Sequence, residues 1–397
     1  MNPILSIAIP THNRSQYAIH TLRSLQNIGV DNFEVIISDT SSDGKLFELI
    51  NNNNDFEKDT RFKYFQPINC FDMSSNLNYA LSKCTGKYVI CIGDDDSICN
   101  DALQAVELAS QYDIDVISPN VSVVYCWSDF KHLLYGLGHA SRLYVPRNIK
   151  KSYYKSPQVA KDESMKFACQ GTDGLPKLYH GFVKRELLET IREKTGNYVH
   201  GSSPDVSSAI SISLFAKNML ITNYPLTIPG ASGGSNTGRA AVKKHVGKIE
   251  DESQTKSFID KGWTIGIPKF FSVETVWAHS ALESVRLVEY ELIKKFNYAH
   301  LFALCYINHK TYKKEIDLAI NDYLSTYKVD KSDFIKEIKK EKFIILKKKL
   351  IYLFKRIIIP TPAGGKKYFK NISNIEEAKK CYESFKEKKG WNVLSIF

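Results

Sequence analysis

Residues 88–102 read YVICIGDDDSICNDA, and this stretch decides the fold. An apolar run from Tyr88 to Ile92 ends in Gly93, and three carboxylates follow at once: Asp94, Asp95 and Asp96. Adjacent like charges repel, so a triplet placed after a buried strand needs compensation. Either the triplet is a solvated acidic turn before the next helix, or it faces a cation. Carboxylate oxygens are the hard ligands that suit Mg²⁺ or Mn²⁺.

The flanking sequence alternates between two patterns. Short apolar runs rich in β-branched residues predict strands, and segments with apolar residues at helical spacing separate them. The predicted strands are Leu5–Pro10, Phe33–Ser38, Phe62–Phe65, Tyr88–Ile92 and Val116–Ser118, and the predicted helices are Gln16–Ile28, Asn76–Cys84 and Asp101–Tyr112. Continuous apolar strands alternating with helices predict a mostly parallel sheet covered on both faces.

Polar residues follow three of these strands. They are Pro10-Thr11-His12-Asn13-Arg14 after the first, residues 39–44 (DTSSDG) after the second, and Gly93 with the acidic triplet after the fourth. In parallel α/β sheets, ligands bind just outside the carboxyl ends of the strands. The sequence therefore predicts one polar site at this edge.

Composition limits the classes of protein. A length of 397 residues predicts one large domain or two. The net charge of +11 lies almost wholly in residues 331–370, which hold 13 Lys/Arg against 3 Asp/Glu, so no nucleic-acid partner is expected. The eight cysteines show no C-x-x-C spacing, which favours free thiols in a reducing compartment. With neither a signal-peptide pattern nor a long apolar run, the expected location is the cytoplasm.

Three motifs in register carry a resemblance to a known family. SIAIPTHNR, FEVIISDTSSDG and NLNYALSKCTGKYVICIGDDD resemble the nucleotide-binding half of a family 2 glycosyltransferase with the GT-A fold. The resemblance is strong over about residues 4–125 and weak to about residue 240. It implies a GT-A domain over 1–240, divided into a nucleotide-binding half (1–125) and an acceptor half (126–240). A mainly helical region, 241–397, follows.

The resemblance also implies roles for individual residues. Asp96 would be the metal ligand for Mn²⁺ or Mg²⁺, and Asp94 and Asp95 would lie nearer the ribose and the sugar. The other residues that would contact the nucleotide sugar are Pro10, Thr11, Asn13, Arg14, Asp39, Asn76 and Asn78. Two departures matter: Asp39 is followed by Thr40, and Leu77-Asn78 stands where many members have Arg-Asn. Asn76 and Asn78 would partly replace that arginine.

Inverting sugar transfer needs a carboxylate to accept the proton of the acceptor hydroxyl. By the resemblance this base is Asp205, in GSSPDVSSAISISLFAK. The alternative is structural, because Ser203, Pro204 and Asp205 also suit the first turn of an ordinary helix, where an acid is favourable. Asp173, in QGTDGLP, is the reserve candidate.

Three further features have two interpretations each. His180 either lines the sugar pocket or is a structural histidine. The Gly/Ser-rich stretch 229–238, with Arg239, Lys243, Lys244 and His245 after it, either closes over the diphosphate or is a mobile surface loop. Residues 342–359, KFIILKKKLIYLFKRIII, predict a basic amphipathic helix. This helix either lies on anionic lipid or packs on the catalytic domain or a partner subunit.

The interpretation that joins these features is an inverting, metal-dependent hexosyl- or N-acetylhexosaminyltransferase. It would move a sugar from a nucleoside-diphosphate donor, expected to be UDP-linked, to a glycan or polyprenyl-linked acceptor in bacterial surface polysaccharide (capsule or O-antigen) synthesis. It would be cytoplasmic, with a peripheral place on the inner face of the plasma membrane. The sequence does not decide between a monomer and an oligomer. The rivals are a sugar nucleotidyltransferase and a non-catalytic, membrane-associated subunit that binds nucleotide sugars.

Overall fold

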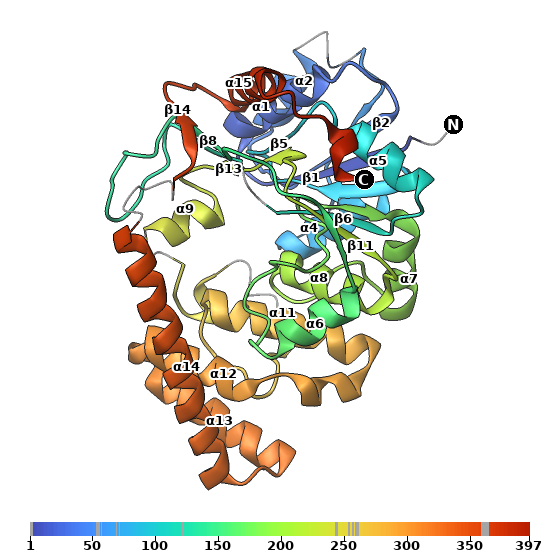
Figure 1. The fold of residues 1–397 in the computed structure, drawn as a ribbon. Coiled ribbons are helices and arrows are strands. Elements are labelled where there is room, and N and C mark those ends of the chain that lie inside the picture. The colour runs from blue at the N-terminus through green and yellow to red at the C-terminus, as the bar shows by residue number, and fades with distance from the viewer. Residues whose placement is uncertain are drawn as a thin grey trace.

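The computed structural model of the chain describes residues 3–52, 56, 58–68, 70, 72–120, 123–242, 245–252, 255, 258, 262–358 and 365–397. Its main sheet has eight strands in the order β3-β2-β1-β4-β10-β6-β11-β9 (Figure 1). Their bounds are β1 Leu5–Thr11, β2 Phe33–Asp39, β3 Phe62–Phe65, β4 Tyr88–Cys91, β6 Val116–Pro119, β9 Tyr153–Lys155, β10 Phe182–Lys184 and β11 Met219–Thr222. All neighbouring pairs are parallel except those that β10 makes with β4 and β6 and that β9 makes with β11.

Helices cover both faces of this sheet. Side chains alternate along each strand, so Ile7 and Ile9 of β1 pack on one face while Ala8 packs on the other. The first face is covered by α1 Ser15–Gln26, α2 Lys45–Asn51 and α5 Ala102–Gln111. The second is covered by α4 Met73–Ser82, α6 Pro157–Met165, α7 Arg185–Thr195 and α8 Pro204–Phe215. The expected mostly parallel α/β sheet flanked by helices is confirmed.

Two smaller sheets lie beside the carboxyl ends of the main strands. One pairs β5 Ser97–Ile98 with β12 Thr227–Ile228, and the other has the order β13-β7-β8-β14. The strands of the second are β13 Gly230–Ala231, β7 Val124–Cys126, β8 Arg142–Val145 and β14 Lys367–Phe369. The stretch 229–238, expected to be a loop, thus forms strand β13, which pairs with β7, and the first turn of α9 Asn236–Ala241.

The region after residue 270 is predominantly helical, as expected. It contains α11 Val273–Val288, α12 Tyr298–Asn308, α13 Lys313–Tyr327 and α14 Lys331–Ile358, drawn from yellow to red in the lower part of Figure 1. Short 3₁₀ turns, η1 Ile249–Asp251, η2 Tyr290–Lys295 and η3 Lys310–Tyr312, precede or connect them. Among the described helices, none combines the length and apolar character that a bilayer crossing requires.

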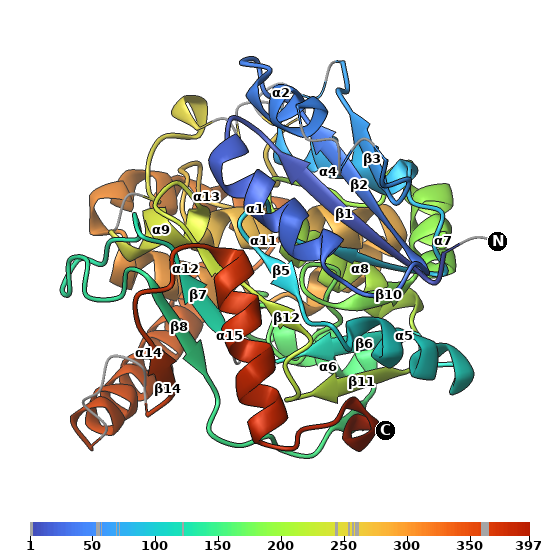
Figure 2. The same cartoon turned by 90° about the horizontal axis from the view of Figure 1, so that it is seen from above.

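The last described segment returns to the N-terminal half. α15 Ile375–Lys388 lies against α1 and β5, far from the other C-terminal helices (Figures 1 and 2). Lys379 Nζ donates to the carbonyl of Ser24 at 2.8 Å, and Tyr382 is fully buried. The turn η4 Val393–Ile396 adds two side chains to the core under α5. The domain boundary near residue 240 stays a prediction, but residues 365–397 do not lie with the helices that precede them.

Candidate active site

The carboxyl ends of β1, β2 and β4 meet at one edge, as the sequence predicted. Thr11, the last residue of β1, is paired in register with Asp39, the last residue of β2. Thr11 Oγ1 donates to Asp94 Oδ2 at 2.7 Å, which ties β1 to the acidic triplet after β4. All three triplet residues are buried, so the edge is a desolvated acidic cluster and not a solvated turn.

Arg14 compensates two of the three carboxylates. It stands at the start of α1, where its Nε lies 2.8 Å from Asp94 Oδ1 and its Nη2 lies 2.8 Å from Asp95 Oδ2. The same Nη2 donates to Ser232 Oγ at 2.8 Å, and that hydroxyl donates to Asp95. Burial alone would lower the pKa of Arg14, but the two aspartates raise it, so this cation is held in the site in its charged form.

Asp96 is the hydrogen-bonding centre of the cluster. Its Oδ2 accepts from the Gly93 amide at 2.6 Å and from Tyr179 Oη at 3.1 Å, and its Oδ1 accepts from the Gly230 amide at 2.6 Å. His180 Nε2 lies 3.3 Å from Oδ2. Burial alone would raise the pKa of Asp96, but His180 and the two amides hold it below its usual value. Asp96 is therefore an anion at neutral pH.

The two glycines that bond Asp96 have no room for a side chain. A Cβ on Gly93 would lie 2.4 Å from Tyr179 Oη, and a Cβ on Gly230 would lie 1.9 Å from the Asp95 carbonyl oxygen. Gly230 belongs to β13, so the 229–238 stretch is built into the acidic edge. Only glycine allows these two amides to approach the carboxylate so closely.

Asp205 occupies the first turn of α8, where the sequence placed it. Its Oδ1 is buried and has no hydrogen-bond partner among the residues that the structure describes, and the same holds for Nδ1 of His180. Burial, and then repulsion from Asp96, raise the pKa of Asp205 to about 6, while His180 acts in the opposite direction. Asp205, His180 and Asp96 therefore interact electrostatically at one place, although they come from three separate segments. An acid that only stabilised the start of a helix would not need a second buried carboxylate and a histidine beside it.

The remaining predicted nucleotide contacts lie around the same edge and hold the local structure. Asp39 accepts from the Ser41 amide and from Tyr64 Oη, each within 2.8 Å. Asn76 accepts from Ser38 and donates to the Thr11 carbonyl, while Asn78 exchanges three hydrogen bonds with the backbone of residues 198–199. Asn13 adopts a left-handed backbone and its amide donates to Ser41 Oγ. Pro10 pairs in register with Ser38. Their contacts with a donor stay predictions.

The other candidates have different surroundings. The Asp173 side chain is fully exposed. Arg239 makes a two-pronged ion pair with Glu252, and His245 is buried against the ring of Phe271. Lys243 and Lys244 lie outside the described residues. Several site residues were missed from the sequence: Ser232 and Tyr179, which touch the triplet, and Trp127, whose Nε1 donates to the Asp95 carbonyl.

The cluster carries more negative charge than its protein cations neutralise. Asp94, Asp95, Asp96 and Asp205 lie around a single arginine, Arg14. The pKa of Asp95 is raised to about 7 by burial first and by repulsion from Asp96 next. Within the described residues, no group of three or more His, Cys, Asp and Glu side chains could hold a metal alone. Mg²⁺ commonly takes one or two carboxylates together with substrate phosphates, so the donor set fits a divalent cation that a diphosphate completes.

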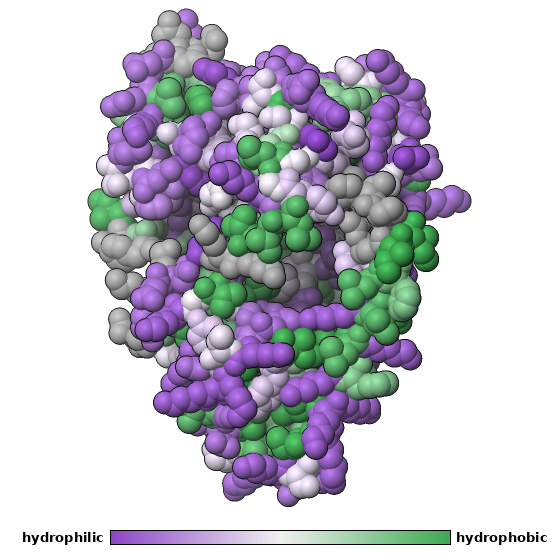
Figure 3. Space-filling view, turned by 90° about the vertical axis from the view of Figure 1, so that its left-hand side faces the viewer, coloured by the Kyte–Doolittle hydropathy of each residue, from purple (hydrophilic) through white to green (hydrophobic). Residues whose placement is uncertain are grey.

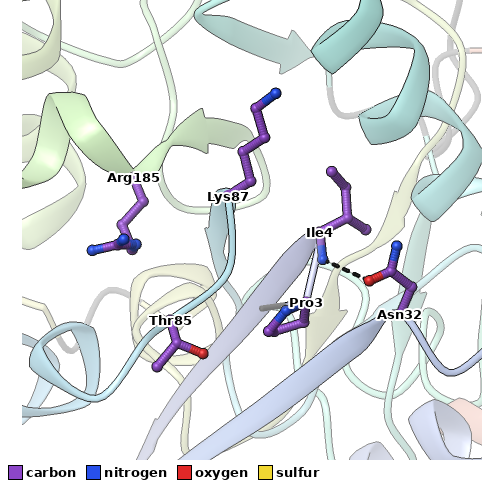
Figure 4. A pocket seen from close by; sticks show the side chains of 6 residues that line it. All are labelled: Pro3, Ile4, Asn32, Thr85, Lys87 and Arg185. Carbon is purple, nitrogen blue, oxygen red and sulfur yellow. Dashed lines mark hydrogen bonds between the residues drawn. The ribbon is translucent and has the colours of Figure 1, made fainter. Parts of the chain in front are cut away.

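A separate pocket lies at the opposite end of the strands. It has a volume of about 400 Å³ (Figure 4). It is lined by residues just before β1 and β4, among them Ile4, Thr85 and Lys87, and by Arg185, the first residue of α7. The Ile4 amide donates to Asn32 there. Because the acidic triplet follows the carboxyl end of β4, this pocket is not part of the candidate site.

Comparison with known proteins agrees with the geometry. Residues 6–172 match the model of "Glycosyl transferase family 2". An uncharacterized glycosyltransferase of Haemophilus influenzae is 36% identical over 103 residues, or 26% of this chain and 40% of that protein. A Campylobacter jejuni protein named GalNAc(5)-diNAcBac-PP-undecaprenol beta-1,3-glucosyltransferase is 30% identical over 105 residues, or 26% of this chain and 33% of that protein. The matched segments thus span well under half of these relatives.

Solved structures resemble the chain more distantly. S. aureus TarS 1-349 in complex with UDP-GlcNAc is 15% identical, with a TM-score of 0.42 over 96% of this chain and 92% of that chain. The mannosyltransferase PcManGT from Pyrobaculum calidifontis, in complex with GDP-Man and Mn²⁺, is 14% identical, with a TM-score of 0.39 over 87% and 86%. Likeness of this degree supports no conclusion about substrate.

Proposed function

We propose that the chain, whose residues 6–172 match the model of glycosyl transferase family 2, is an inverting, metal-dependent glycosyltransferase in which Asp205 is the catalytic base. The donor is a nucleoside-diphosphate sugar, with UDP as the expected nucleotide. The observation that carries the proposal is the Asp205 carboxylate: it lies beside Asp96 and His180, and its buried Oδ1 has no partner within the described part of the chain. A carboxyl whose pKa is about 6 is mostly ionised at neutral pH and can accept a proton.

The proposed reaction is a single displacement at the anomeric carbon of the donor sugar. The acceptor hydroxyl gives its proton to Asp205 while its oxygen forms a bond to the anomeric carbon. The bond from that carbon to the diphosphate oxygen breaks, and the leaving nucleoside diphosphate keeps the electron pair. Attack from the face opposite the leaving group inverts the anomeric configuration. Protonation of Asp205 also removes a buried negative charge beside Asp96, which favours the proton transfer.

The triplet and its partners would bind the donor. Asp96 would hold the divalent cation, with Asp94 and Asp95 nearer the ribose and the sugar; the cation would neutralise the charge that develops on the diphosphate. Among the described residues, Asp96 Oδ1 accepts one hydrogen bond, from the Gly230 amide, so this oxygen retains acceptor capacity. Thr11, Arg14 and Asp39 line the edge where the nucleotide would lie. Arg14 would keep Asp94 and Asp95 oriented through its two ion pairs.

The acceptor is proposed to be a glycan or a polyprenyl-linked saccharide of a bacterial surface polysaccharide. The name of the Campylobacter relative describes a diphospho-undecaprenol-linked acceptor for that protein. The sugar transferred is a hexose or an N-acetylhexosamine. We further propose a cytoplasmic enzyme with a peripheral place on the membrane, supported by the exposed apolar side chains of α14.

The deciding experiment is Asp205→Asn, compared with wild type for donor binding and for transfer. A general base contributes about 10²–10⁴-fold to the rate, so transfer should fall at least a hundredfold while the Kd for the nucleoside diphosphate stays within about threefold. Turnover near wild type would remove Asp205 from the mechanism. Release of pyrophosphate from a nucleoside triphosphate and a sugar phosphate would favour a nucleotidyltransferase, and donor binding without any transfer would favour a non-catalytic subunit.

A further inference from the structure

A basic pocket of about 570 Å³ lies between the end of β8, strand β14 and the end of α15. Figures 1 and 2 show these three elements side by side, on the side of the molecule where α14 ends. Four cationic side chains and two aromatic rings define the pocket: Arg147, Lys366, Lys367, Lys389, Tyr368 and Phe385. Its lining contains no Asp or Glu.

The four cations of the basic pocket lack carboxylate partners within the part of the chain that the structure describes. Lys367 Nζ lies over the rings of Phe369 and Phe385, at 5.1 and 4.9 Å from their centres, and Lys389 also lies over Phe385. Lys366 is partly buried, and burial lowers its pKa. Four positive charges that face one hollow without counter-charge favour an anion with several oxygens.

The helix that leads to the basic pocket, α14, carries an exposed apolar side. Six side chains of α14 spaced along one side are each more than half exposed, namely Phe343, Leu346, Leu350, Leu353, Phe354 and Ile357. The buried residues of the same helix, including Phe334 and Ile345, lie on another side and pack into the main core. Figure 3 shows apolar atoms along the upper part of α14, and β14 begins nine residues after the helix ends at Ile358.

A second exposed apolar segment lies on the same face of the molecule. The loop between β7 and β8 exposes Leu133, Leu134 and Leu137 by 54%, 78% and 56%. Figure 3 shows apolar atoms gathered over this loop as well as over α14. Two apolar segments on one face, with cationic side chains near them, match the composition of a surface that lies in a lipid interface.

We propose that the basic pocket binds the phosphate headgroup of an anionic membrane lipid while the exposed apolar sides of α14 and of the β7–β8 loop enter the interface. Charge complementarity and the adjoining apolar helix favour an anionic lipid over a free phosphate, because a free phosphate would make no contact with the apolar side of α14. A second protein is less favoured because the pocket concentrates like charge at one point.

The position of the basic pocket links it to the acidic edge. β14 and β13 are the outer strands of one four-stranded sheet, and Gly230 of β13 donates to Asp96. Three inter-strand spacings of about 4.8 Å separate them by about 14 Å. A bilayer bound at β14 would therefore lie close to the site where the acceptor must arrive. The lipid assignment itself does not depend on the catalytic role of Asp205.

The experiment compares full-length wild type with two variants that lose the same charge. The pocket variant is Lys366→Gln, Lys367→Gln and Lys389→Gln; the control is Lys58→Gln, Lys269→Gln and Lys310→Gln, all exposed lysines outside the pocket. Each protein is sedimented with vesicles of phosphatidylcholine alone and with added phosphatidylglycerol. We expect the pocket variant to bind the anionic vesicles at least about tenfold more weakly, with the control within about twofold of wild type.

Two further measurements separate the explanations. Inorganic pyrophosphate is titrated against each protein by calorimetry, and transfer to a soluble acceptor is assayed without vesicles. Equal losses in both variants would overturn the pocket and leave only diffuse charge. Pocket-dependent binding of pyrophosphate without vesicle binding would overturn the lipid assignment. Transfer to the soluble acceptor should match wild type in the pocket variant, so failure of this proposal is distinct from failure of the catalytic one.

Discussion

His180 Nε2 lies 3.3 Å from Asp96 Oδ2, and this contact joins the acidic triplet to the turn before β10. His180 has a left-handed backbone with φ of 63°, an uncommon conformation for a residue with a side chain, and its amide donates to the carbonyl of Cys91 at 2.9 Å. Backbone strain of this kind persists where surrounding structure enforces it, and it gathers at functional sites. The neighbourhood of Asp96 and Asp205 fits that description.

The activity should depend on pH through Asp205. Its pKa is raised to about 6, and only the ionised form can accept the acceptor proton. We expect kcat/KM to be level above pH 7 and to fall about tenfold per pH unit below the pKa. A steady-state pH profile checks this, with enzyme stability verified at each pH. A profile that is flat down to pH 5 would contradict the role of this carboxyl.

Asp205 should also make folding stability depend on pH. The ionised form, which activity requires, is the less stable form of the folded protein. Because the folded pKa of Asp205 lies above the unfolded value, the neutral carboxyl contributes stability below about pH 4, and that contribution is lost as pH rises through about 6. Asp205→Asn should therefore be more stable than wild type at pH 8, by about 3 kcal/mol, and equal to it at pH 4. Thermal melts at the two pH values measure the difference. A variant that is less stable at pH 8 would favour the structural role at the helix start.

Removal of Arg14 should damage both fold and donor binding. Arg14→Gln leaves Asp94 and Asp95 buried without their cation, and breaking a buried ion pair in this way typically costs about 3–5 kcal/mol. The matched control is Arg23→Gln, an exposed arginine of the same helix. We expect a lowered Tm and lost UDP binding for Arg14→Gln only. Equal melting of the two variants would show that the ion pairs are not needed.

Donor affinity should depend on a divalent cation. For wild type, EDTA should weaken the Kd for UDP by at least about tenfold relative to Mn²⁺, because the diphosphate supplies the remaining ligands. Asp96→Asn should bind UDP weakly in both conditions. Its Tm should also fall, since Asp96 accepts hydrogen bonds from Gly93, Tyr179 and Gly230. Calorimetry of UDP binding gives the answer, and cation-independent binding by wild type would contradict the metal role.

The close approach of β13 to the triplet gives a steric prediction. Gly230→Ala would place a methyl group 1.9 Å from the Asp95 carbonyl oxygen, so β13 must move away and release the amide that bonds Asp96. The control is Gly29→Ala, which has open space around it. We expect transfer to fall at least about tenfold in Gly230→Ala because a small displacement of catalytic groups is costly, and to be unchanged in the control. Full activity in both would mean that this contact is unimportant.

Much of the nucleotide-binding half could be predicted from the sequence. The five strands expected in residues 1–125 all form, within two residues of their expected ends, because each is a short, predominantly apolar run. The acidic edge followed from those strand ends. The antiparallel β10 could not be predicted, since its three residues carry no periodic signal and its place between β4 and β6 is a long-range pairing.

The missed site residues have the same explanation. Ser232 and Gly230 lie in a stretch whose glycines and serines indicated a mobile loop, and only the pairing of β13 with β7 brings them to the triplet. The packing of α15 against α1 was also missed, since nothing in its local sequence indicates that it contacts the N-terminal half. Truncation after Asp330 would remove α15 together with α14, so surface substitutions are the sounder test of membrane binding.

The contact between Lys379 and Ser24 spans 355 residues of sequence. A ribosome adds about 5–20 residues per second, so α15 is synthesised roughly 20–70 s after the helix α1 that it covers. During that interval β8 also lacks its partner β14, and apolar surface that will be buried stays open to other chains. Long-range closures of this kind are slow. Yield of active protein should therefore be sensitive to translation speed and to chaperone supply, even for variants whose finished fold is as stable as wild type.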